Sequence, residues 1–197
     1  MFLSIPATTA LLIGSDEIIS ALFGYGSFSS EAVFNSAKAL YYFSFGLPAF
    51  ALIKVFSSFF FANHDTKTPF FISLISVFLN VFLSVYFFES IGFIIIPIAT
   101  SISSWFNSLV LFIFLSNKNL FKFNKMFIIK FVKIILSSIL MGIFFLQLIS
   151  LLETQLSYEY NFKFFYMILA VILCIIFYFI ISFFIKAFDY KDLKLKY

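Results

Sequence analysis

The sequence contains no arginine, one cysteine and one histidine, and each of these shortages excludes a class of function. With Cys174 alone, neither a disulfide framework nor a cysteine-based metal site can form within the chain. With His64 alone, most metal and proton-relay chemistry is excluded. All 13 basic residues are lysine, and a chain without the bidentate guanidinium group is poorly equipped to hold a pyrophosphate by itself.

Charge is also scarce, while apolar residues are abundant. Charged residues make up 11% of the 197 residues, hydrophobic residues 63% and aromatic residues 23%, and the mean hydropathy is +1.11. A soluble domain carries about 25% charged residues, so the composition predicts an all-α membrane protein. No nucleophile–base pair, phosphate loop or paired-carboxylate arrangement is present, and the basic loops are a topology signal. We therefore predict neither an enzyme nor a nucleic-acid-binding protein.

The hydropathy pattern predicts a polytopic protein with about six transmembrane helices, since each span needs roughly 20 apolar residues. The predicted spans cover residues 2–23, 31–63, 69–88, 91–116, 126–150 and 164–187. An even number of spans places both ends of the chain on one side of the membrane.

The distribution of lysine predicts which side that is, because short cytoplasmic loops collect positive charge. Ten lysines fall on one side and two, Lys38 and Lys163, on the other. The ten are Lys67, Lys118, Lys122, Lys125, Lys130, Lys133, Lys186, Lys191, Lys194 and Lys196. The acids Glu31, Glu89, Glu153 and Glu159 fall on the lysine-poor side. We expect both termini of this chain to be cytoplasmic.

Lys54 is the first candidate functional residue, because it lies deep in the second predicted span. A buried charge in a membrane costs several kcal/mol unless it faces water or a partner. One interpretation is a cation that lines a substrate cavity and meets an anionic group. The other is a lysine that extends to the nearby cytoplasmic interface.

Two pairs of titratable residues are weaker candidates. Asp16 and Glu17 interrupt the first span, where they either line an outward-facing vestibule or lie at the membrane interface. His64 and Asp65 occupy a polar loop, in which a solvated histidine is the more common case than a ligand or a switch.

A set of neutral oxygen groups lies in the third and fourth spans. Asn80 and Ser84 are four residues apart and share a helix face, and Thr100 follows Pro97. A proline within a span frees a backbone carbonyl, such as that of Ile96. These groups suit a small hard cation such as Na⁺, and they equally suit hydrogen bonds that join two helices.

Several motifs in fixed order carry a family resemblance. Ser44-Phe-Gly-Leu-Pro48, Ile53-Lys-Val55 and Asp65-Thr-Lys-Thr-Pro69 resemble the tenth helix and following cytoplasmic loop of the MurJ (MviN) family of bacterial lipid II flippases. Upstream, Leu11 to Phe28 resembles the ninth helix of that family, and residues 80–84 and 92–101 resemble its eleventh and twelfth helices.

The resemblance implies a fold and a function. The family belongs to the multidrug/oligosaccharidyl-lipid/polysaccharide exporter superfamily, whose members have two six-helix lobes, and lipid II flippases add two helices that form a groove for the lipid tail. Residues 1–116 would then be most of the second lobe, and residues 117–197 the extra pair with its basic loop and tail. The chain would correspond to helices nine to fourteen of an inner-membrane protein. That protein moves lipid-linked peptidoglycan precursor to the periplasmic leaflet by alternating access.

The resemblance also assigns residues. Lys54 matches a cavity lysine, and Asn80, Ile96 and Thr100 match a sodium site, whereas Ser84 stands where the family has an aspartate. Without arginine and without the N-terminal helices that carry most cavity charges, we expect this chain to be inactive alone. Its partners would be lipid II, membrane lipids and those missing helices, with Na⁺ as a candidate coupling ion and no other cofactor. One alternative is a self-standing six-helix membrane protein that acts as a scaffold or assembly partner. Another is a flippase for a different lipid-linked glycan, and the Asp65–Pro69 motif argues against this second alternative.

Overall fold

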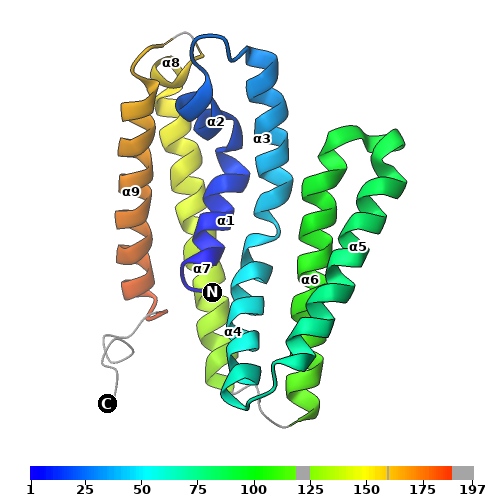
Figure 1. Cartoon of the computed structure of the whole chain (residues 1–197). Coiled ribbons are helices and arrows are strands. Elements are labelled where there is room, and N and C mark those ends of the chain that lie inside the picture. Colours follow the sequence, from blue (N-terminus) through cyan, green and yellow to red (C-terminus); the bar gives the residue numbers. More distant parts are fainter. Residues whose placement is uncertain (119–124, 159, 188–197) are drawn as a thin grey trace. The chain divides into compact units, whose positions relative to one another are not determined.

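The computed structural model describes residues 1–118, 125–158 and 160–187, and every regular element in them is helical (Figure 1). The elements are α1 (Ser4–Ile13), α2 (Ser15–Phe23), α3 (Ser30–Ser44), α4 (Leu47–Ala62), α5 (Lys67–Ile91), the 3₁₀ turn η1 (Gly92–Ile94), α6 (Ile95–Asn117), α7 (Lys125–Leu151), α8 (Glu153–Leu156) and α9 (Lys163–Phe184). The predicted all-α class is confirmed. Lys122, Glu159, Lys191, Lys194 and Lys196, which entered the topology prediction, lie outside the described residues.

The chain forms two compact units. Met1–Ala37 and Asn124–Tyr197 make up the first, and Lys38–Phe123 makes up the second. These units differ from the division at residue 117 that the family resemblance implies, because the first two helices pack with the last ones. The two-lobe division remains a prediction about a larger protein.

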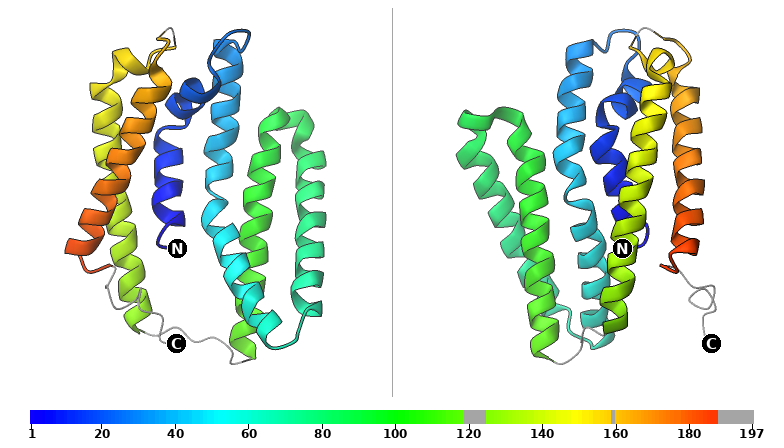
Figure 2. Two further views of the ribbon diagram at one scale, coloured as in Figure 1. Left: turned by 60° about the vertical axis from the view of Figure 1, so that its left-hand side comes forward. Right: turned by 180° about the vertical axis from the view of Figure 1, so that it is seen from behind.

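Three described segments are long and apolar enough to cross a membrane: Lys67–Asn117, Lys125–Leu151 and Lys163–Phe184. The number rises to five if each of two bent helix pairs is one span. The 51 residues of Lys67–Asn117 contain both α5 and α6, which lie side by side as an antiparallel pair (Figures 1 and 2). The count of six spans stays a prediction.

The first bent pair replaces the single continuous span that residues 2–23 predict. Helices α1 and α2 meet at 81°, with Gly14 between them. The ring of Phe145 occupies the space that a side chain at residue 14 would need, 2.6 Å from its Cβ position. Asp16 and Glu17 lie in the first turn of α2, where negative charge stabilises a helix N-terminus. The polar residues that interrupt the apolar run therefore start a new helix.

The second bent pair is α3 and α4, which meet at 40°. Gly46 caps α4, and Pro48 follows in its first turn, where the missing N–H has no helical partner in any case. Two carbonyls at this break receive hydrogen bonds from α6: Ser101 Oγ donates to Tyr42 O at 2.7 Å and Trp105 Nε1 to Phe45 O at 2.8 Å. A break at membrane depth requires such donors, because lipid supplies none.

Small and apolar residues form the core of each unit. In the first unit, α7 packs between α1 and α9 (Figure 2), around the completely buried Phe145. In the second, Phe60, Leu111 and Leu115 are completely buried between α4 and α6. Large apolar side chains remain exposed on α5, such as Phe78, which is 67% exposed. Exposed apolar surface of this kind is typical of membrane helices, since acyl chains are as apolar as the side chains they meet.

Candidate functional site

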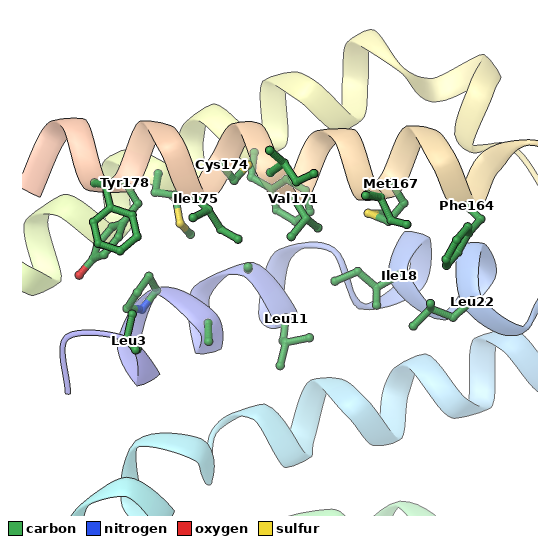
Figure 3. Close-up of a pocket in the computed structure, with 18 residues that line it drawn as sticks. Leu3, Leu11, Ile18, Leu22, Phe164, Met167, Val171, Cys174, Ile175 and Tyr178 are labelled. Carbon is green, nitrogen blue, oxygen red and sulfur yellow. The ribbon is translucent and has the colours of Figure 1, made fainter.

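An apolar pocket of about 580 Å³ lies in the first unit (Figure 3). Helices α1, α2, α7 and α9 line it with apolar side chains and no charged one. The lining residues are Leu3, Pro6, Ala7, Ala10, Leu11, Ile18, Leu22, Met141, Phe145, Phe164, Met167, Ile168, Val171, Ile172, Cys174, Ile175, Tyr178 and Phe179. The volume falls within the range of about 300–1,000 Å³ that is typical of ligand pockets. The lining suits a hydrocarbon ligand and offers nothing that would hold a sugar or a phosphate.

The pocket exists because α1 presents small residues toward α9 at the point where α2 turns away. Ala7 and Ala10 leave the space that larger side chains would fill. The hydroxyl of Tyr178 donates to Phe2 O at 2.7 Å, and the two rings lie 5.2 Å apart. This contact holds the beginning of the chain against α9 at one end of the pocket, where Figure 3 shows Tyr178 near Leu3.

Lys54 lies on α4 in the second unit and is exposed. Its backbone carbonyl accepts a hydrogen bond from Ser58 Oγ at 2.9 Å. Within the described part of the chain, no carboxylate forms an ion pair with its ammonium group. This exposure fits both interpretations of Lys54, a cation that lines a substrate cavity and a lysine that extends to the membrane interface.

The predicted oxygen set does come together, between α5 and α6. Asn80 Nδ2 donates to Thr100 Oγ1 at 3.0 Å and to Ser103 Oγ at 3.3 Å. Ser84 Oγ donates to Asn80 Oδ1 at 3.5 Å, and Thr100 Oγ1 donates to Ile96 O at 2.8 Å. Each group is therefore a partner of another group in the same set.

This arrangement does not fit a sodium ion. The four groups are neutral and bonded to one another, and hard cations in proteins usually take carboxylate ligands. Among the described residues, no cluster of three His, Cys, Asp or Glu side chains is placed to hold a metal. Pro97 lies in the first turn of α6, so it does not free the Ile96 carbonyl. The set has the geometry of polar contacts that join two membrane helices.

A second polar contact between the same helices was not predicted. Asn107 Nδ2 donates to Ser73 Oγ at 3.4 Å. Ser73 precedes Asn80 by seven residues and Asn107 follows Thr100 by seven, so the two contacts lie two helical turns apart along an antiparallel pair. A search for matched seven-residue spacing could have found it. No comparable sequence signal marks the contacts of Ser101 and Trp105 with the α3–α4 break.

Asp16 and Glu17 line a small polar pocket of about 260 Å³ in the first unit. Ser20, Ser30, Val33, Phe34, Leu156 and Tyr158 complete its lining. The position at the start of α2 accounts for both acids, since they complement the positive end of the helix. The vestibule interpretation remains a prediction.

His64 and Asp65 lie in the turn between α4 and α5, and only Asp65 has a clear role. Its carboxylate accepts hydrogen bonds from the Thr68 backbone N–H at 3.0 Å and the Thr68 hydroxyl at 2.8 Å, and pairs with Lys118 Nζ at 2.6 Å. The hydrogen bond from Lys118, followed by those from Thr68, lowers the pKa of Asp65 from 3.8 to about 2. Asp65 thus caps α5 and ties it to the end of α6. His64 adopts a left-handed backbone conformation, with φ of 57°.

Comparison with known proteins identifies related chains. The family described as "Lipid II flippase MurJ" matches residues 1–171. A probable lipid II flippase MurJ of Thermotoga maritima is 36% identical over 142 residues, which cover 72% of this chain and 28% of the relative. The corresponding protein of Rhizobium meliloti is 42% identical over 112 residues, or 57% of this chain and 21% of the relative. A solved structure of "Lipid II flippase MurJ, inward closed conformation" superimposes with a TM-score of 0.73 and 28% identity, over 98% of this chain and 37% of that one.

Proposed function

The chain belongs to the MurJ family of lipid II flippases, and from that premise we propose that it forms the lipid-tail-binding part of such a flippase. It spans between a fifth and two fifths of the length of the relatives and of the solved structure. The substrate would be lipid II, the lipid-linked precursor of peptidoglycan, moved from the cytoplasmic to the periplasmic leaflet of the inner membrane by alternating access. Both ends of this chain would face the cytoplasm.

The apolar pocket is the observation that carries the proposal. A polyprenyl tail is a long branched hydrocarbon, and its binding requires apolar contact area and no hydrogen bonds. The pocket lies between the broken helix pair α1–α2 and helix α9 (Figure 3). Apolar side chains from these helices and from α7 line it, so its walls supply apolar contact area. Tail binding of this kind favours a lipid substrate over a soluble one.

The head group would be held mainly by other parts of the flippase. The chain has no arginine, the side chain best suited to a pyrophosphate. Lys54 is an exposed cation on α4 and would contribute one positive charge to the substrate cavity. We therefore propose that the chain binds lipid tails by itself but does not translocate lipid II by itself.

Photolabelling tests the proposal. The chain is reconstituted in vesicles that contain a polyprenyl phosphate with a photoreactive group in its tail, and the labelled peptides are mapped. We expect labels on α1 and α9 residues of the pocket. Ala10→Phe, which fills the pocket, should reduce labelling several-fold.

Ala62→Phe is the matched control, because it adds the same volume at an exposed position on α4 outside the pocket. Uniform labelling of the exposed face of α5, or labelling that Ala10→Phe leaves unchanged, would contradict the proposal. Equal competition by an ordinary phospholipid would show general lipid contact and support the scaffold alternative.

A further inference from the structure

Lys163 is completely buried, although it is the first residue of α9. Both facts are unfavourable for a cation, because burial removes hydration and the N-terminus of a helix carries partial positive charge. The sequence offered this lysine only as one of two on the lysine-poor side. Its surroundings must therefore compensate for its charge.

Two carbonyls and two aromatic rings provide that compensation. Lys163 Nζ donates hydrogen bonds of 2.7 Å to Gly24 O and of 2.7 Å to Tyr158 O. It also lies 4.7 Å from the ring centroid of Tyr25 and 4.6 Å from that of Tyr158. Carbonyl dipoles and ring faces are favourable partners for a desolvated ammonium group. Within the described residues, no carboxylate pairs with Lys163.

The partners of Lys163 join two segments that are far apart in the sequence. Gly24 directly follows the last residue of α2, and Tyr158 lies between α8 and α9. Tyr158 adds a second connection, because its hydroxyl donates to Phe28 O at 2.6 Å. The turn between α2 and α3 is thus attached to the start of α9 by side-chain hydrogen bonds.

This attachment lies at one end of the apolar pocket. Lys163 directly precedes Phe164, and Gly24 follows Leu22 by two residues; Figure 3 shows Phe164 and Leu22 together at that end. The opposite end is held by the bond from Tyr178 to Phe2 O. The pocket wall formed by α1 and α2 is therefore attached to α9 at both ends.

We propose that Lys163 is a positioning residue that sets the opening of this pocket at the α2 end. Its ammonium group reaches two carbonyls on different segments at once, which a neutral side chain of the same length cannot do. The consequence for lipid binding rests on the proposed function, whereas the positioning itself does not.

Distance measurement between spin labels tests the positioning. Labels are placed at Phe23→Cys and Phe165→Cys, two exposed positions beside the attachment, in a Cys174→Ala chain in lipid nanodiscs. In the Lys163→Met variant we expect the distance distribution to broaden and to shift toward longer distances. Lys67→Met is the matched control, since Lys67 is the exposed first residue of α5 and should leave the distribution unchanged.

Two further variants separate positioning from a general loss of stability. Tyr25→Leu removes one ring from a side chain that is 39% exposed, so the chain should fold, and a smaller shift in the same direction is expected. Tyr178→Phe breaks the contact at the opposite end and should leave the 23–165 distance unchanged.

The proposal is overturned if Tyr25→Leu leaves the 23–165 distance distribution unchanged and Lys163→Met, provided that this variant folds, does so too. It is also overturned if Tyr178→Phe shifts the distribution as much as Lys163→Met does. Photolabelling of the same variants distinguishes the two proposals. A shifted distance in a chain that takes up no polyprenyl label would retain the positioning role and contradict the lipid-tail function. Photolabelling of the pocket without any change in the 23–165 distance would support the lipid-tail function and contradict the positioning role of Lys163.

Discussion

The indole Nε1–H of Trp105 donates a 2.8 Å hydrogen bond to the backbone carbonyl of Phe45, 60 residues earlier in the chain. Phe45 lies at the break between α3 and α4, where the helical hydrogen-bond pattern stops. One turn earlier on α6, Ser101 donates to Tyr42 O. A break that would be costly in lipid is thus stabilised by two donors on one face of another helix.

Ser101→Ala should destabilise the second unit, because it leaves the Tyr42 carbonyl with fewer partners. A hydrogen bond between membrane helices contributes about 0.6 kcal/mol on average and at most about 1.7 kcal/mol. We expect a loss in this range, measured by unfolding in mixed micelles, together with a changed emission of Trp105, the single tryptophan. Ser104→Ala is the control, since its hydroxyl bonds only to Thr100 O within α6. Equal effects of the two substitutions would contradict the role of Ser101.

Asn80→Leu should weaken the α5–α6 pair by about 1 kcal/mol, because it removes the donor that reaches Thr100 and Ser103. Added Na⁺ should not raise the unfolding midpoint beyond the effect of K⁺ at equal concentration. Asn63→Ala is the control, since its amide donates only to Phe59 O on its own helix. A Na⁺-specific stabilisation that Asn80→Leu abolishes would assign these residues to a cation site instead.

Acid should weaken the contact between Asp65 and Lys118. The pKa of Asp65 is about 2 in the folded chain against an ordinary value of 3.8, so the ionised form stabilises the folded state above the ordinary value. That stabilisation is lost as the pH falls from about 4 to about 2. The unfolding midpoint should fall over this interval, and Asp65→Asn should flatten the change. Glu89→Gln, at the other end of α5, is the control and should leave the pH dependence of the unfolding midpoint unchanged.

Gly14→Ala should displace the buried ring of Phe145, whose Cε1 lies 2.6 Å from the added Cβ. Overpacking of this kind costs about 1–3 kcal/mol. Because Phe145 also lines the apolar pocket, lipid labelling should change as well. The double variant Gly14→Ala/Phe145→Leu should recover part of the loss, as measured in a double-mutant cycle. If the losses of stability from Gly14→Ala and Phe145→Leu simply add in the double variant, the Phe145 ring is not what disfavours a side chain at residue 14.

Lys54→Ala should reduce lipid II translocation in a reconstituted full-length flippase that contains this chain, with normal insertion and expression. The reason is the loss of a positive charge that faces the proposed substrate cavity. Lys67→Ala, which removes an exposed lysine at the start of α5, is the control. Unchanged translocation would place Lys54 at the membrane interface.

Much of the fold and part of the site follow from local sequence. Apolar runs and scarce charge determine a helical membrane protein, because the backbone in lipid must satisfy its own hydrogen bonds. The motifs from Ser44 to Pro69 indicated the MurJ family. The spacing of Asn80 and Ser84, and the hydroxyl of Thr100, also indicated a common set, although the proline argument for the Ile96 carbonyl was wrong because Pro97 lies in the first turn of α6.

Only the tertiary structure decided the rest. The lack of space for a side chain at Gly14, in the 81° bend, is due to Phe145; the burial of Lys163 depends on Gly24 and Tyr158, and the pKa of Asp65 depends on Lys118. The apolar pocket likewise needs α1 and α9, from opposite ends of the chain. The free energy of a buried charge or a helix break is set by the groups that pack against it. Except for Tyr158, which is five residues from Lys163, those groups lie tens to more than a hundred residues away, so no local pattern could have specified them.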